Sequence, residues 1–534
     1  MTLSFDLVSE AWIPSLMRNG EASELGIRDV LAQAPDIRSI LDPSPVVTVC
    51  LHRLLLAILH RNFGPKSHEA WAEIWRKRGW DHEVLESYFT NHRDRFDLFH
   101  PTHPFFQVPQ LEPKPDDKSP GYELSSLAKH YLSAGSSATL FDHTVDTRPF
   151  SPAQAARLLL ALQSFFLGGT VSRLKGEGPS AEGGPLSKGV AVLVEGENLF
   201  ETLMLNLLIY DPASGRPFVL QQAADRPAWE QEPDREAAGR HPLGYLDYLS
   251  WPSLRVRLMP ELEEGRLVVH RMIAAAGTRL SKDGLREPQF AYNINRKKNP
   301  GPKDEPWLPV RLRPDKALWR DSTALLVATP QRTDAPSFKP PEACHLVAQL
   351  IERGVLDVSA RYRLAIFGLC NDRAKPAKVN FWRHESMPAP AALFVDPEAA
   401  SLLEEAVSLA ERVGNALNLA ILPEAGPGRG RATGAEKTRE LPPSVLAACL
   451  AAYWSLLDGP FLGFLGELSE SRYEALRSWA LCLRSYARKA MDMAVERLGS
   501  SATALKQGTK ARGRLEGQLA RLVGDYEEGG HDND

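Results

Sequence analysis

The pattern of apolar and polar positions divides the chain into two parts of different character. As far as about residue 380, short apolar runs switch between the two-residue period of strands and the three- to four-residue period of helices. Gly and Pro separate these runs, and the mixture predicts one large α/β domain over residues 1–385. The expected strands are Leu3–Val8, Val190–Val194, Leu254–Leu258, Leu267–Val269 and Leu364–Phe367, and the expected helices are Val46–Leu59 and Pro152–Leu167.

Beyond about residue 390 the strand patterns disappear and four helical stretches follow. Apolar residues recur in them at spacings of three and four, which places these residues on one face of each helix. The pattern predicts a C-terminal four-helix bundle over residues 390–534, so the expected fold class is α+β. The stretches carry Leu403–Ala420, Ser444–Leu457, the stripe from Leu476 to Leu498, and Leu515, Leu519 and Leu522.

Length and composition are those of a globular protein with more than one domain. The 534 residues exceed the roughly 250–300 at which a single core stops growing, and 43% are hydrophobic and 24% charged. The formal net charge is −4 and the pI is about 6.4, so the chain as a whole does not attract nucleic acid. Any contact with nucleic acid must therefore be local.

The cysteines and the N-terminus favour a reduced, cytoplasmic protein. The five cysteines form no CxxC pair, which predicts free thiols rather than disulfides or a zinc site. The first ten residues lack the basic and apolar regions of a secretory signal. The longest apolar stretch, Val445–Leu457, is shorter than the about 20 residues that span a bilayer, and no cofactor is expected.

Motifs of common enzyme classes are missing from the sequence. It holds no GxSxG nucleophile elbow, no GxxxxGK[ST] phosphate loop, no HExxH and no well-placed GxGxxG. His100 and His103, with His92 nearby, have two readings: they could bind a metal ion, or they could fix a Pro-rich turn, which we favour. These absences remove the easily recognised enzyme classes, and the chain is expected not to be an enzyme.

Basic residues gather in two segments, Arg279–Arg313 and Arg373–Arg383, the second with Phe381 and Trp382 interleaved. Lysine and arginine pair with backbone phosphates without reading sequence, so these clusters are candidate nucleic-acid contacts. The alternative interpretation of the two clusters is a solvated surface loop. A third basic group lies on the third helical stretch, and its alternative interpretation is a solvated helix face. That group consists of Arg484, Arg488 and Lys489.

Glycines are dense between Gly168 and Gly189. Because glycine lacks a Cβ, it lets a backbone adopt positive φ and approach a ligand closely. The residues alone favour the simpler interpretation, a flexible loop that follows the expected helix ending at Leu167.

Four segments in order along the chain resemble the large subunit of type I-E Cascade, the CasA family. They are Phe5–Pro14, His103–Gln107, Asn198–Asn206 and Leu249–Pro252, and an apparent four-helix domain follows them. The resemblance implies a subunit of a crRNA-guided complex that checks duplex DNA for a protospacer-adjacent motif and starts unwinding beside it. The implied partners are the other Cascade subunits, crRNA, double-stranded target DNA and a helicase-nuclease that does the cutting.

The resemblance also implies roles for particular residues. The family reads the minor groove with a glycine loop, a lysine finger and a glutamine wedge, and the loop matches Leu167–Thr170, with Gly168, Gly169 and Thr170 as its DNA-facing residues. A reader of the minor groove tolerates several motifs because that groove presents a degenerate pattern. The candidates for the lysine finger are Lys297 and Lys298, with Lys282 in reserve.

The wedge matches Asn371, Asp372 and Arg373, and here the sequence departs from the family because Arg373 stands at the glutamine position. A guanidinium can still stack on an exposed base. Phe141 and His143 match a loop that docks into the complex near the crRNA 5′ handle. The resemblance further implies that the bundle holds DNA, which makes Arg484, Arg488 and Lys489 candidate contacts.

Overall fold

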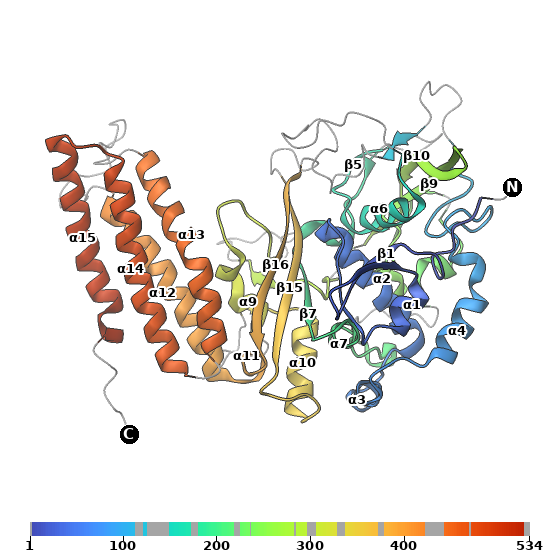
Figure 1. The fold of residues 1–534 in the computed structure, drawn as a ribbon, viewed down its shortest axis with the longest axis horizontal. Coiled ribbons are helices and arrows are strands. Elements are labelled where there is room, and N and C mark those ends of the chain that lie inside the picture. The colour runs from blue at the N-terminus through green and yellow to red at the C-terminus, as the bar shows by residue number, and fades with distance from the viewer. Residues whose placement is uncertain are drawn as a thin grey trace. The chain divides into compact units, whose positions relative to one another are not determined.

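The computed structural model shows two compact units. Unit 1 comprises Met1–Leu312, Ser337–Leu356 and Tyr362–Ser386, and unit 2 comprises Arg313–Pro336, Asp357–Arg361 and Met387–Asp534 (Figure 1). The chain therefore leaves unit 1 more than once. The residues that the structure describes are 3–112, 121–124, 149–171, 180–217, 225–234, 236–281, 285–295, 306–327, 337–371, 379–421, 443–468 and 471–527.

Unit 1 is a mixture of short sheets and helices. Its helices are α1 (Ile27–Ala32), α2 (Pro45–Phe63), α3 (His68–Lys77), α4 (His82–Asn91), α6 (Pro152–Phe165), α7 (Leu199–Leu205), α8 (Tyr245–Leu249) and α10 (Glu342–Glu352). Its strands are β1 (Ile13–Met17), β2 (Ala22–Leu25), β3 (Ile37–Ile40), β4 (Tyr122–Glu123), β5 (Gly169–Thr170), β6 (Ser180–Ala181), β7 (Ala191–Glu195), β8 (Gly239–Arg240), β9 (Leu254–Glu263), β10 (Arg266–Ala276), β11 (Arg279–Leu280), β12 (Tyr292–Ile294), β13 (Trp307–Pro309), β14 (Phe338–Lys339), β15 (Arg361–Asn371) and β16 (Val379–Pro390).

The core of unit 1 forms around α2, which is buried from Pro45 to His60. Pro45 suits the first helical position because its φ is already helical and its missing N–H would be unpaired there anyway. α6 packs against α2 and begins with a capping box, in which Gln154 N donates to Ser151 Oγ at 3.2 Å and Ser151 N donates to Gln154 Oε1 at 3.0 Å. Both helices therefore start where their sequences predict.

A long antiparallel hairpin is formed by β9 and β10, whose order in their sheet is β4-β10-β9. Glu264 and Gly265 make its turn with φ of 49° and 77°. A second sheet has the order β16-β15-β7, and a third, β13-β12-β14, pairs Ile294 with Trp307. The sheets give unit 1 its α/β character.

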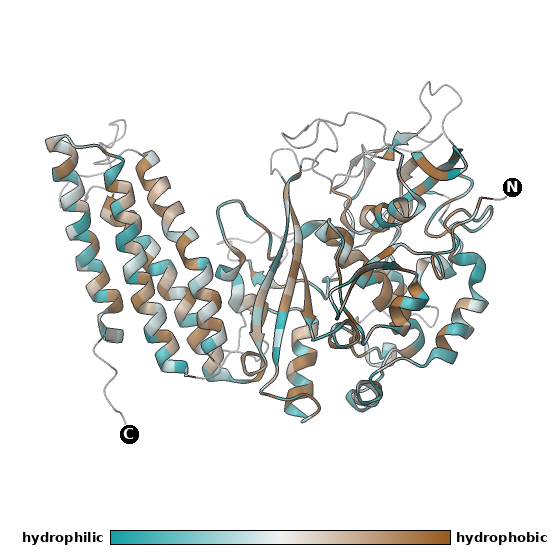
Figure 2. Ribbon diagram, in the orientation of Figure 1, coloured by the Kyte–Doolittle hydropathy of each residue, from teal (hydrophilic) through white to brown (hydrophobic). Residues whose placement is uncertain are grey.

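Unit 2 is mainly helical in its described residues, although the last residues of β16, Met387–Pro390, also belong to it. Its long helices pack against one another, and apolar stripes run along them (Figures 1 and 2). Trp319 joins this core from outside the long helices, because its ring stacks on Phe461 with centroids 4.5 Å apart and its Nε1 donates to Asp458 at 2.7 Å. The elements are α9 (Ser322–Leu326), α11 (Ala392–Val395), α12 (Pro397–Ile421), α13 (Pro443–Glu467), α14 (Arg472–Glu496) and α15 (Ala502–Glu527).

The structure confirms the α+β class with a helical C-terminal region, and each expected helix and strand but one overlaps an observed element. The expected strand Leu3–Val8 is wrong. The Asp6 carboxylate accepts from Val8 N at 3.0 Å and from Ser9 Oγ at 2.6 Å, so these residues turn back on themselves, and the first strand begins at Ile13.

The helix expected at Ser444–Leu457 is longer than the sequence suggested, since α13 continues through Pro460 to Glu467. Two described helices are long and apolar enough, by length and composition alone, to cross a membrane, namely α2 and Ser444–Glu467 of α13. The apolar window of α2 is 83% buried, as in the core helix of a globular protein, whereas that of α13 is 28% buried.

Candidate nucleic-acid interface

The glycine loop is an exposed turn with an unusual backbone. α6 ends at Phe165, and Gly168 and Gly169 then adopt φ of 79° and 126°. A Cβ added to Gly169 would meet no atom within 4 Å, and Gly169 and Thr170 are both exposed. This turn therefore presents bare backbone to solvent, where a flat partner surface can approach it closely.

Two further glycines hold the glycine loop against the end of α6. Gly184 N donates to Phe166 O at 2.7 Å, and a Cβ on Gly184 would lie 2.5 Å from the backbone oxygen of Ser164. Gly183 is similarly tight, with Ser187 Oγ 2.7 Å from its added Cβ. Gly169 of β5 also pairs with Ala181 of β6 in a short antiparallel ladder. The loop is thus built on close packing at Gly183 and Gly184, a role that we did not predict from the sequence.

Most of the other predicted site residues lie outside the described residues. These are the lysine-finger candidates, two residues of the wedge and the docking residues: Lys282, Lys297, Lys298, Asp372, Arg373, Phe141 and His143. Asn371 is described and is the last residue of β15. Because Ile294 pairs with Trp307, the two ends of the segment that contains Lys297 and Lys298 lie side by side.

A buried ion pair anchors the chain just before that segment. Arg53 of α2 and Glu287 lie 3.2 Å apart through Nη2 and Oε2, with side chains only 2% and 3% exposed. Arg53 also donates to Gln289 Oε1 at 2.8 Å and to Leu249 O at 3.0 Å. Burial alone would lower the pKa of Arg53, but the Glu287 carboxylate raises it above its usual value, so the guanidinium stays charged.

The predicted contacts of the helical region lie on α14, and two of them have carboxylate partners. Arg488 donates through Nε and Nη2 to Glu516 of α15 at 2.7 and 2.6 Å, and Arg484 Nη2 lies 3.9 Å from Glu516. The hydrogen bond from Arg488 lowers the pKa of Glu516. Lys489 is exposed on the same helix. A phosphate bound here would have to replace Glu516 as the partner of Arg488.

The structure around His100 and His103 agrees with the interpretation that these histidines fix a Pro-rich turn. His100 Nδ1 accepts from His103 N at 3.0 Å, and the two rings stack with centroids 5.7 Å apart. Within the described residues, the one group of side chains close enough to share a metal ion is Glu261, Glu263 and His270. His270 Nε2 already pairs with Glu263 Oε1 at 2.6 Å, and both carboxylates are exposed.

Comparison with known proteins assigns the fold and the family. A family model described as CRISPR-associated protein Cse1 matches residues 6–490. The CRISPR-associated protein CasA/Cse1 of Thermus thermophilus is 34% identical over 541 residues, which cover 97% of this chain and 98% of that protein.

Two solved structures extend the likeness to the fold. The crystal structure of Cse1 from Acidimicrobium ferrooxidans has a TM-score of 0.80 at 25% identity and covers 98% of this chain and 99% of its own. A chain of a CRISPR RNA-guided surveillance complex shares the fold, with a TM-score of 0.74 at 21% identity over 96% of this chain and 99% of its own. The chain belongs to the CRISPR-associated Cse1 family, also called CasA.

Proposed function

We propose that this chain is the large subunit of a cytoplasmic type I-E Cascade complex. In this role it recognises the protospacer-adjacent motif in double-stranded DNA, starts target unwinding and helps recruit the helicase-nuclease. Its partners are the other Cascade subunits, crRNA and target DNA, and the chain itself catalyses no reaction. The proposal is supported by membership of the Cse1 family and by the fold shared with a chain of an RNA-guided surveillance complex.

The observation that carries the proposal is the glycine turn. A minor groove is about 6 Å wide, so a reader that enters it with main chain must keep side-chain atoms away from the groove floor. Gly168 and Gly169 satisfy this condition, since both have positive φ and Gly169 faces open space. Thr170, exposed next to them, adds a hydroxyl that can bond to a phosphate or a base edge.

The remaining roles divide the work of binding and strand opening. Lys297 or Lys298, with Lys282 as the reserve, neutralises phosphate beside the groove. Asn371, Asp372 and Arg373 form the wedge that separates the first base pair, at a cost of a few kcal/mol per unstacked step that contacts to the bent duplex must offset. Phe141 and His143 dock the subunit near the crRNA 5′ handle, and Arg484, Arg488 and Lys489 hold DNA.

The decisive experiment measures binding of short duplexes, with systematically varied motif bases, to the guide-loaded complex with and without this chain. We expect discrimination between motifs only when the chain is present. Equal discrimination in its absence would remove the reader role and leave a scaffold that binds protein partners only. DNA cleavage by the isolated chain that depends on a divalent metal ion would instead favour the alternative of a stand-alone nuclease.

A further inference from the structure

Unit 1 contains a cavity of about 190 Å³ that is separate from the glycine loop. It lies between the turn at His103–Gln107, the segment Ala228–Asp234 and the start of β9. Phe105, Phe106 and Trp229 form its aromatic wall, with ring centroids 5.5–6.1 Å apart. The proposed reader uses none of these side chains.

The backbone of Phe106 is held in a conformation that phenylalanine rarely adopts. Its φ is 58°, in the left-handed region, which costs a bulky residue on the order of 1–3 kcal/mol. The next side chain holds the turn, because Gln107 Nε2 donates to Leu98 O at 2.7 Å and Gln107 Oε1 accepts from Leu258 N at 2.7 Å. The fold thus maintains a strained position that sets a half-buried ring in the cavity wall.

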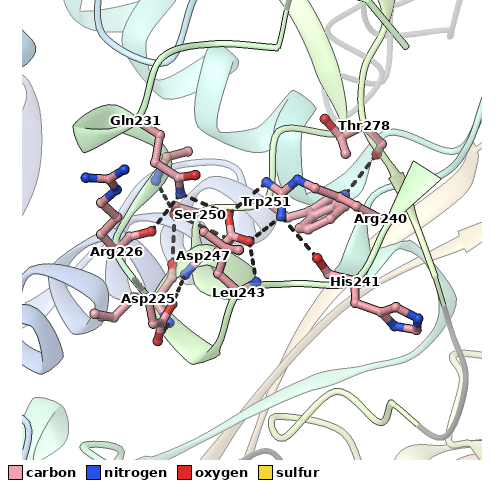
Figure 3. A network of polar contacts seen from close by, with 12 residues as sticks. Asp225, Arg226, Gln231, Arg240, His241, Leu243, Asp247, Ser250, Trp251 and Thr278 are labelled. Carbon is pink, nitrogen blue, oxygen red and sulfur yellow. Dashed lines mark hydrogen bonds and ion pairs between the residues drawn. The ribbon is translucent and has the colours of Figure 1, made fainter. Parts of the chain in front are cut away.

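Hydrogen bonds also hold the polar side of the cavity in place. The fully buried Asp247 carboxylate binds Arg240, accepts from Leu243 N at 2.8 Å and accepts from Gln231 Nε2 at 3.1 Å (Figure 3). The Arg240 guanidinium also lies over the Trp251 ring, 4.5 Å from its centroid. Arg240 and Gln231 both line the cavity, and the network prevents them from moving freely.

The cavity offers hydrogen-bond donors and acceptors in similar number. The guanidinium groups of Arg95, Arg240 and Arg255 supply donors, and Glu232 and Asp234 supply carboxylate oxygens. Part of this capacity is used within the protein, since Arg95 donates to Glu232 at 3.1 Å, Arg255 donates to Ala276 O at 2.7 Å, and the Thr278 hydroxyl donates to Asp234. A simple anion would be repelled by the two carboxylates, and a simple cation by the three guanidinium groups. A neutral ring with both donors and acceptors on its edge fits this set of groups.

We propose that the cavity binds one unstacked nucleobase. A cavity of about 150 Å³ holds benzene, so about 190 Å³ suits one substituted heteroaromatic ring. Sites that take up a flipped base combine aromatic stacking with hydrogen bonds to the base edge, and this cavity is lined by the groups for both. The inference goes beyond motif reading, because it concerns a different surface of unit 1 and needs neither a duplex nor a guide.

The binding test uses the isolated full-length chain and 5′-fluorescein-labelled single strands of five nucleotides. One strand carries adenine at the centre and a matched strand carries an abasic site, each made as DNA and as RNA. Fluorescence anisotropy should show binding about tenfold tighter with the base present, since one stacked base contributes about 1–3 kcal/mol. Equal binding of the matched strands would overturn the proposal.

The informative variant is Phe106→Gly, which removes the ring and relaxes the positive φ, so that folding is preserved. It should abolish the preference for the base, and Asp234→Asn should reduce it by changing the acceptors on the cavity edge. The control is Tyr473→Ala, which removes a ring that is 72% exposed in unit 2 and should leave the preference intact. A preference that survives both cavity variants would place base binding elsewhere and refute the assignment.

Competition identifies the source of the base. Displacement of the strand by adenosine monophosphate would show that a free nucleotide suffices, whereas no displacement, with the Phe106-dependent preference intact, would assign the site to a base within a strand. Stronger displacement by N-acetyltyrosinamide than by the nucleotide would overturn the proposal in favour of a protein side chain. Because the assay contains no motif and no complex, its failure would leave the proposed reader untouched.

Discussion

At the scale of single residues, Gly169 is required for its backbone conformation rather than for lack of space. Residues with a side chain rarely adopt its φ of 126°, although nothing lies within 4 Å of an added Cβ. We expect Gly169→Leu to weaken binding of motif-containing duplex to the guide-loaded complex at least about tenfold, by blocking close approach. Thermal unfolding should shift little, since the strain amounts to about 1–3 kcal/mol in an exposed turn.

Gly265 supplies a matched control for this prediction. It also has positive φ, 77°, and open space around an added Cβ, but it lies in the turn of the β9–β10 hairpin. Gly265→Leu should cost similar stability and leave DNA binding unchanged. If both leucine variants bind DNA equally well, the glycine loop is not part of the reader.

Buried histidines should make unit 1 sensitive to acid. Burial lowers the pKa of His60 to about 4, while its Nδ1 donates to Leu56 O at 2.8 Å. The unfolded chain, with an ordinary histidine pKa of about 6.5, binds a proton that the folded chain excludes between pH 6.5 and 4. The free energy of unfolding should therefore fall by about 1.4 kcal/mol for each pH unit in this range, per buried histidine of this kind.

Urea unfolding between pH 7.5 and 5 measures this slope. His60→Gln should make it shallower by the contribution of one proton, whereas His82→Gln, at an exposed position, should leave it unchanged. His52 has its pKa lowered to about 4 by the same burial and should account for a similar part of the slope. An unchanged slope in His60→Gln would show that another group controls acid unfolding.

At the scale of elements, the pair of Arg53 and Glu287 joins α2 to the chain that leads into β12. Both side chains are almost fully buried, so removal of one leaves an uncompensated charge. We expect Arg53→Met to lower the free energy of unfolding by about 3–5 kcal/mol. The double variant Arg53→Met, Glu287→Gln should recover part of this loss in urea denaturation, and equal stabilities of the single and double variants would contradict the interpretation.

The arginines of α14 should bind DNA in competition with Glu516. If Arg488 contacts phosphate, Glu516→Gln should tighten binding of DNA to the complex, because a carboxylate no longer competes for the guanidinium. Arg488→Ala should instead lower the slope of log affinity against log salt by about one. Salt titrations of the two variants and of the neighbouring Lys489→Ala measure both effects, and unaltered slopes would exclude α14 from the interface.

The sequence predicts elements well where one local signal decides them. The helices expected at Val46–Leu59 and Pro152–Leu167 correspond to α2 and α6, and apolar spacing from Leu476 onward follows one face of α14. Prediction from the sequence fails where a side chain redirects the backbone, as Asp6 does in the expected first strand.

The candidate site is predicted less completely than the fold. Gly168 and Gly169 are candidates through the resemblance to the CasA family, since the residues alone favoured a flexible loop, and the structure gives both a positive φ. The packing role of Gly184 depends on Ser164, which lies twenty residues earlier in sequence but within 2.5 Å of an added Cβ. The pairing of Arg53 with Glu287 spans 234 residues. Contacts of this kind arise from tertiary structure, so no local sequence pattern predicts them.

At the scale of the whole molecule, docking into a complex should depend on the segment of Phe141 and His143, which lies outside the described residues. We expect Phe141→Ala to reduce co-purification of this chain with the crRNA-loaded complex, since loss of a buried aromatic anchor typically costs about 2 kcal/mol or more, about thirtyfold in affinity. Affinity capture through another subunit measures the retained fraction. Exposed Tyr473 offers the matched aromatic control, and normal capture of Phe141→Ala would refute the docking assignment.

The discontinuous make-up of unit 2 has a consequence for biosynthesis. Trp319 emerges from the ribosome 139 residues before Asp458, the acceptor of its indole N–H, and before the Phe461 ring on which it stacks. At synthesis rates of about 5–20 residues per second, roughly 7–30 s pass between synthesis of this tryptophan and synthesis of its native neighbours. During that interval its apolar surface is open to chaperones, so codon choice between these positions should influence the yield of folded protein.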